Sequence, residues 1–168
     1  MTRGAGGNQG GEVGLAARVM AAEHPAPPHA PMTLRICGAL GVAPFWLLPL
    51  IGFVSASDRA MAGQALAGYA AIILSFLGGS RLGLTLSGER ATSTILLSMA
   101  PPLLGWALML VPTMSQGLRF CGLALCLTGH ALWDGHAQDV PQWYGSLRRR
   151  LTVCAVGGLL AAAAVWHG

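Results

Sequence analysis

The chain has 168 residues, of which 54% are hydrophobic and only 10% are charged, whereas an ordinary soluble domain carries about 25% charged residues. The charges fall in short clusters between long apolar stretches instead of spreading around helices, which argues against water as the surrounding solvent. The formal net charge of +4 is better explained by membrane topology and anionic lipid headgroups than by nucleic acid. We therefore predict an all-α polytopic membrane bundle with no nucleic-acid partner.

The first 32 residues are rich in Gly, Ala and Pro and show no hydrophobic period. They lack the continuous apolar region of a cleavable signal peptide. We expect residues 1–32 to be a disordered tail and residues 33–168 to be the transmembrane domain. The sequence leaves Met1, Met20 and Met32 open as the start of the protein.

Five apolar stretches follow the tail. Crossing about 30 Å of hydrocarbon requires about 20 apolar residues in a helix. The third stretch contains Pro101 and Pro102, which predict a kink that neighbouring helices can accommodate. The fourth contains Arg119, whose side chain we expect to reach the headgroups. The predicted spans are 36–54, 61–80, 94–113, 115–133 and 151–167.

The arginines predict the orientation of these spans, because short cytoplasmic loops carry an excess of Lys and Arg. Five spans place Arg59 and Arg119 on one side and eight arginines on the other. We therefore expect the N-terminus inside the cytoplasm and the C-terminus outside, in a bacterial inner membrane. The eight arginines are Arg3, Arg18, Arg35, Arg81, Arg90, Arg148, Arg149 and Arg150.

Small residues recur at every fourth position of the second span. Such patterns let another helix backbone approach closely in lipid, where van der Waals contact drives association. We expect this small-residue stripe to make the second span the central packing helix, with a homodimer seam as the alternative. Its members are Gly63, Ala67, Ala71, Ser75, Gly79 and Gly83.

Three polar residues fall at the expected cytoplasmic ends of spans two and four. Charges inside a membrane suggest function, although Arg81 could instead reach the headgroups or pair with Asp134. His130 and Asp134 lie four residues apart, hence on one helix face, as in a proton relay or in a helix end that satisfies itself. His167 lies at the opposite membrane face, so no haem site is expected.

The segment that joins spans four and five places Trp143 and Tyr144 ahead of Arg148. Amphipathic aromatics settle at headgroup level and arginines attract anionic lipid. We expect this segment to be an interfacial anchor.

No catalytic or metal-binding constellation is recognisable. A Walker loop, a nucleophile elbow, a zinc-protease motif and paired carboxylates are all missing from the sequence. We expect no enzyme activity, no catalytic residue, no metal and no cofactor. The cysteines form no C-x-x-C pair and are expected to be small core residues: Cys37, Cys121, Cys126 and Cys154.

Several segments resemble one known family. They are VAPF (42–45), ILSFLGG (73–79) with the following Arg81, SMAPPLLGW (98–106) and WYGSLRRRLT (143–152). The chain from about Leu34 to Trp166 is similar to an uncharacterised bacterial inner-membrane family, domain of unknown function 3429, related to the mitochondrial transmembrane protein 69. Family members often carry an aromatic where Leu82 stands and a proline where Gly145 stands. The resemblance implies a five-helix bundle and brings no activity, substrate or cofactor.

Two functions remain open at this point. The preferred hypothesis is a non-enzymatic accessory or assembly factor, whose partners are the lipid bilayer, other inner-membrane proteins or a second copy of itself. The alternative is a small transporter or channel, possible as a homo-oligomer, based on Arg81, the Pro101-Pro102 break and the His130/Asp134 pair.

Overall fold

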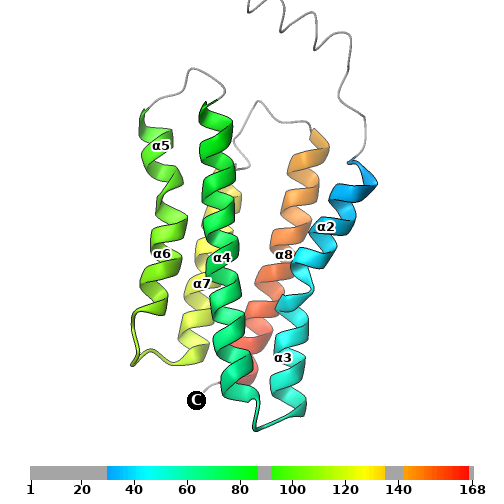
Figure 1. Ribbon diagram of the computed structural model, residues 1–168, viewed down its shortest axis with the longest axis vertical. Coiled ribbons are helices and arrows are strands. Elements are labelled where there is room, and N and C mark those ends of the chain that lie inside the picture. The colour runs from blue at the N-terminus through cyan, green and yellow to red at the C-terminus, as the bar shows by residue number, and fades with distance from the viewer. Residues whose placement is uncertain (1–29, 87–91, 135–141, 167–168) are drawn as a thin grey trace, which may run out of the picture.

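The computed structural model describes residues 30–86, 92–134 and 142–166. These residues form seven helices and no strand (Figure 1), which confirms the all-helical class. Two stretches, Met32–Val54 and Arg59–Gly83, are long and apolar enough to cross a membrane, whereas Thr94–Met109 is apolar but shorter. The helices are α2 (Met32–Val42), α3 (Pro44–Val54), α4 (Arg59–Leu86), α5 (Thr92–Ser98), α6 (Ala100–Met109), α7 (Gln116–Asp134) and α8 (Gln142–Val165).

The seven helices form five rods: α2 with α3, α4, α5 with α6, α7, and α8. Prolines divide the two rods that consist of two helices. Pro44 begins α3, and the single residue Ala43 separates it from α2 while keeping helical dihedral angles. Pro101 and Pro102 lie in the first turn of α6, which Met99 separates from α5. A proline in a first turn removes no intrahelical hydrogen bond. The expected break in the third span is therefore present, just ahead of the prolines.

The five rods close into a ring around a core of leucine, phenylalanine and alanine. Helix α4 contacts α3, α5, α6 and α7, while α8 contacts α7, α3 and α2. Figure 1 shows α4 in the middle of the view. The largest fully buried side chains include Phe45, Leu66, Leu74, Phe120, Leu123, Leu127 and Leu159.

The small-residue stripe does not follow the packed face of α4 along its whole length. Gly63 and Ala67 are buried and Ala71 is half-buried, but Ser75, Gly79 and Gly83 are exposed. Residues four apart advance about 400° around a helix, so each step turns the stripe by about 40°. The expectation of one continuous packing face was therefore wrong, although α4 packs centrally.

Helix α8 begins at Gln142, nine residues before the expected start of the fifth span at residue 151. The part of the expected interfacial segment that the structure describes from Gln142 onward is therefore helical. At the third span, α6 ends at Met109, four residues before the expected end at residue 113. Residues 1–29, the loop residue Arg90 and His167, on which other expectations rest, lie outside the described residues.

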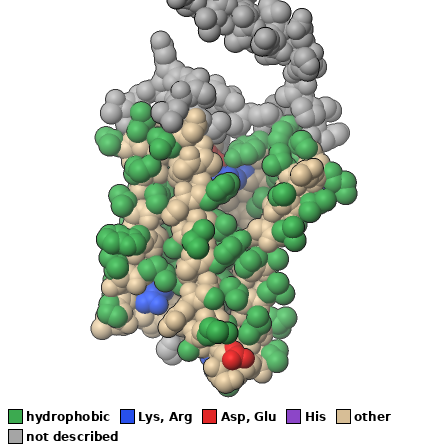
Figure 2. Space-filling model, viewed as in Figure 1, with side chains coloured by type: hydrophobic (Ala, Val, Ile, Leu, Met, Phe, Trp, Pro, Cys, Tyr) green, Lys and Arg blue, Asp and Glu red, His purple; other side chains and the backbone are tan. Residues whose placement is uncertain are grey.

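Large apolar side chains are exposed on every rod of the bundle, and Figure 2 shows many of them on one face. Leu125 on α7 is 74% exposed, Phe76 on α4 is 66% exposed and Val153 on α8 is 65% exposed. Soluble monomers rarely show apolar surface on this scale. The cysteines share this surface, against expectation: Cys37, Cys121 and Cys154 are exposed and Cys126 is half-buried.

Candidate functional site

The polar residues that the sequence singled out converge at one end of the bundle. Arg81 lies near the end of α4, His130 and Asp134 lie at the end of α7, and Arg148 lies in the second turn of α8. Antiparallel neighbours bring the end of α7 next to the start of α8 (Figure 1). We call Arg81, His130, Asp134, Tyr144 and Arg148 the polar cluster.

Asp134 joins the two arginines of the cluster. Its Oδ1 lies 3.2 Å from Nη1 of Arg81, and its Oδ2 lies 3.4 Å from Nε of Arg148. The three side chains are only 7%, 9% and 14% exposed for Arg81, Asp134 and Arg148. The proposed pairing of Arg81 with Asp134 is present, so Arg81 does not simply reach out to solvent. A buried charge that loses such a partner is strongly destabilising.

The cluster carries more positive than negative charge. Two guanidinium groups face one carboxylate, and His130 can add positive charge but cannot offset it. Both ion-pair distances also exceed the 2.7–2.9 Å typical of charge-assisted hydrogen bonds. The indole of Trp133 lies 4.9 Å from the guanidinium carbon of Arg81 and stabilises it through a cation–π contact. Within the polar cluster the formal charges are therefore two positive and one negative, with His130 neutral.

His130 is held by an arginine rather than by Asp134. Its Nε2 lies 3.4 Å from Nη2 of Arg148, and its ring meets the indole of Trp133 edge-on at 5.6 Å. Because arginine can only donate, Nε2 accepts in this contact and the imidazole carries its proton on Nδ1. Nδ1 is buried and has no hydrogen-bond partner among the described residues. His130 and Asp134 share a helix face, but the side-chain hydrogen bond of the His130 ring is with Arg148.

The first turns of α8 place some side chains inside the bundle and others on its surface. Tyr144 and Arg148 lie four residues apart, and the Tyr144 hydroxyl accepts a hydrogen bond of 3.2 Å from Nη1 of Arg148. Arg149 and Arg150 are exposed. Trp143 packs against the Tyr144 ring with 6.1 Å between centroids. Only part of this segment can therefore act as the expected anchor, because Arg148 turns into the bundle.

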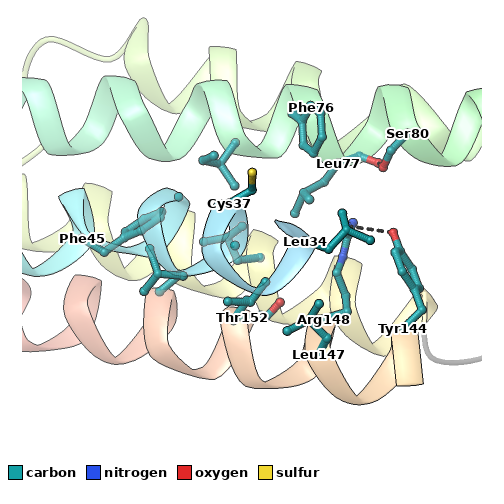
Figure 3. A pocket seen from close by; sticks show the side chains of 17 residues that line it. Leu34, Cys37, Phe45, Phe76, Leu77, Ser80, Tyr144, Leu147, Arg148 and Thr152 are labelled. Atoms are coloured by element: carbon teal, nitrogen blue, oxygen red, sulfur yellow. Dashed lines mark hydrogen bonds between the residues drawn. The ribbon is translucent and has the colours of Figure 1, made fainter. Parts of the chain in front are cut away.

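A groove of about 330 Å³ runs from the cluster between α2, α4 and α8, with Leu127 of α7 also lining it. In Figure 3, Arg148 and Tyr144 lie at one end and Phe45 lies at the other. The groove exists because α4 and α8 do not approach each other closely over their described residues. The Tyr69 hydroxyl donates to the Gly41 carbonyl at 2.7 Å and ties α4 to α2 near the Phe45 end. No local sequence pattern indicated this groove, because its walls come from different helices.

The opposite end of the bundle holds two other arginines. Nε of Arg59 donates to the Gly52 carbonyl at 3.2 Å. Arg119 donates to the carbonyls of Leu108 at 3.2 Å and Val111 at 2.8 Å. Last-turn carbonyls lack intrahelical partners, so Arg119 caps the end of α6 instead of simply reaching toward a membrane surface.

Among residues 30–86, 92–134 and 142–166, no three His, Cys, Asp or Glu side chains come together in a way that could hold a metal ion. A family described as "Protein of unknown function (DUF3429)" matches residues 30–164 of the chain. This range contains all the helices described above except the last residue of α8. It also contains the whole polar cluster. No curated protein and no solved structure matches the chain.

Proposed function

The chain belongs to the protein family of unknown function DUF3429, and we propose that it is a five-span bacterial inner-membrane protein that serves larger membrane complexes as a non-enzymatic accessory or assembly factor. The apolar exterior of the bundle carries this proposal. A resemblance to the mitochondrial transmembrane protein 69 adds an energy-transducing membrane as the proposed location.

Lipid contact explains the distribution of side chains. Leu125, Phe76 and Val153 project from three different helices, and the exposure of such side chains to hydrocarbon carries no hydrophobic penalty. Helices α7 and α8 are the least apolar rods by sequence, but Asp134 and Arg148 turn inward and pair. Both helices can therefore cross the membrane with an apolar outer face.

The arginines support a cytoplasmic location for the polar cluster. Arg35, Arg149 and Arg150 lie at the same end of the bundle as the cluster, whereas Arg59 and Arg119 lie at the other end. This asymmetry follows the positive-inside rule. A reporter fused after Gly168 should report the periplasm, and one inserted within residues 135–141 should report the cytoplasm. A cytoplasmic signal from both fusions would contradict five spans.

The exposed half of the small-residue stripe supports a protein partner. A Cβ atom added at Gly79 or Gly83 would meet no heavy atom within 4 Å, and Ser75 is exposed beside them. A partner helix could therefore approach the α4 backbone closely at these positions. Another inner-membrane protein or a second copy of this chain could supply that helix.

The core below the polar cluster favours an accessory role over a transporter or channel. The next layers toward the middle of the bundle contain Leu74, Leu123 and Leu127, all at most 1% exposed. Among the described residues the buried polar side chains are Arg81, Ser98 and His130. The Ser98 hydroxyl donates back to the Ile95 carbonyl of its own helix, so it does not extend a proton relay from His130. Pro102 packs close to Gly78 instead of lining a pathway.

Affinity purification from native membranes tests the accessory role. The wild-type protein should enrich subunits of a respiratory or translocation complex. Gly79→Leu should lose that enrichment without loss of folding, while Gly129→Leu, another exposed helical glycine with no heavy atom near its Cβ position, should retain it. Recovery of the wild-type protein alone would count against an accessory role. Equal enrichment by both variants would show that partners bind elsewhere.

A further inference from the structure

The groove between α2, α4 and α8 changes in character along its length. Phe45 lines the end away from the cluster, whereas Ser80, Tyr144 and Arg148 line the other end. Figure 2 shows basic side-chain atoms in a hollow between α4 and α2. We propose that this groove binds one acyl chain of an anionic phospholipid, with the lipid phosphate at Arg148 and Tyr144.

The dimensions of the groove fit one membrane leaflet. On α2 and α3 its lining extends from Leu34 to Phe45, which corresponds to about 16 Å at 1.5 Å per helical residue. Half of a hydrocarbon core of about 30 Å is about 15 Å. An acyl chain that starts at Arg148 would therefore end near the bilayer midplane, at the level of Phe45.

The basic end of the groove can bind a phosphate. Nη1 of Arg148 donates one of its two N–H groups to Tyr144 and Nη2 donates one of its two to His130, so each of these nitrogens keeps a second N–H for a phosphate oxygen. The Tyr144 hydroxyl accepts from Arg148, so its own proton remains available for a phosphate oxygen. Arginine binds phosphate through several parallel donors, and the guanidinium of Arg148 at this end of the groove complements an anionic headgroup.

The apolar walls of the groove favour a lipid chain over a protein segment as its occupant. A single hydrocarbon chain requires no hydrogen bonds from the apolar walls, whereas an extended peptide would leave its backbone groups unpaired there. A lipid chain therefore suits the apolar walls of the groove and leaves no backbone group unpaired there.

Native mass spectrometry of the full chain in detergent tests this proposal, with phosphatidylglycerol and phosphatidylcholine of identical acyl chains added in turn. The wild-type protein should retain one phosphatidylglycerol per chain at least tenfold more tightly than phosphatidylcholine. Gly41 lines the groove and has no heavy atom within 4 Å of its Cβ position. Gly41→Phe should therefore fill the groove without strain and weaken retention at least tenfold, while Gly129→Phe should bind as the wild type does.

A second pair of variants tests the headgroup contact. Arg148→Gln should reduce retention of phosphatidylglycerol to the level of phosphatidylcholine, whereas Arg149→Gln, whose residue is exposed, should leave the preference intact. If Arg148→Gln fails to fold, the comparison of Gly41→Phe with Gly129→Phe decides alone. Equal retention of the two lipids by the wild type, equal binding by the two phenylalanine variants, or a second protein chain in place of lipid would overturn the proposal.

The inference rests on the proposed membrane location but not on the accessory role. The reporter fusions test the location separately, and partner enrichment uses α4 positions outside the groove lining. Failure of lipid binding with correct fusions would therefore overturn the groove assignment and leave the location standing.

Discussion

At one end of the bundle, Arg59 and Arg119 donate to backbone carbonyls at the ends of α3 and α6. At the other end, Arg81 and Arg148 share the carboxylate of Asp134 across three different helices. A simple count of arginines treats these residues alike. Their partners show that the first pair completes local helix ends, whereas the second pair joins distant parts of the chain beside a groove.

The two kinds of contact differ in how strongly stability depends on them. A single hydrogen bond contributes about 0.5–1.5 kcal/mol net, so a helix end that loses one is weakened modestly. Removal of one member of a buried ion pair leaves an uncompensated charge and costs about 3–5 kcal/mol. Substitutions at the two ends should therefore differ in size.

Asp134→Ala should have the largest effect. It removes the carboxylate that the buried guanidinium groups of Arg81 and Arg148 share, and we expect a loss of about 3–5 kcal/mol in the free energy of unfolding. Reversible unfolding of the full chain in mixed detergent micelles gives this value. Asp58→Ala, at the opposite end, is the control. Similar small losses for both variants would remove the energetic distinction between the ends.

Gly78→Leu should follow in size. A Cβ atom at Gly78 would lie 2.5 Å from the Ser98 carbonyl oxygen and 2.8 Å from Cδ of Pro102, and overpacking of this kind costs about 1–3 kcal/mol. The neighbouring Gly79→Leu provides a matched control, because its Cβ would meet nothing within 4 Å. The same unfolding measurement should show a loss at Gly78 alone. A larger loss at Gly79 would mean that the stripe packs inside the bundle after all.

Hydropathy and helical period predicted the five rods, because each rod is a local property of its own residues. The pairing of Arg81 with Asp134 was also foreseen as one option, since both residues lie at the ends of their helices. The stripe was misread beyond Ala71 because its period of four does not match the helix period of about 3.6. The inward turn of Arg148 and the groove could not be foreseen, because they depend on how far α4 and α8 stand apart.

Arg119→Gln tests the opposite end and should have a smaller effect. It removes two hydrogen bonds to the carbonyls of Leu108 and Val111. Water or the shorter glutamine side chain can replace one of these bonds. We expect a loss of about 1 kcal/mol. Arg149→Gln, an exposed position on α8, should stay within about 0.5 kcal/mol of the wild type. A loss at Arg119 as large as that of Asp134→Ala would show that the capping end is equally critical.

Tyr144→Phe should have the smallest effect. It removes the hydroxyl that accepts from Arg148 at 3.2 Å, but Arg148 keeps its contacts with Asp134 and His130. The hydroxyl also borders the groove, where water or a headgroup oxygen can take its place. We therefore expect a loss of at most about 0.5 kcal/mol, at the low end for a single hydrogen bond.

Tyr69→Phe is the matched comparison for this variant. Its hydroxyl donates to the Gly41 carbonyl at the shorter distance of 2.7 Å, away from the polar cluster, and a lost donor there has no charged neighbour to compensate. Tyr69→Phe should therefore lose more stability than Tyr144→Phe when both are unfolded under identical conditions. If Tyr144→Phe loses more stability, the Tyr144 hydroxyl is a principal partner of Arg148. The ion pair between Arg148 and Asp134 would then contribute less to the position of Arg148 than its link between α7 and α8 indicates.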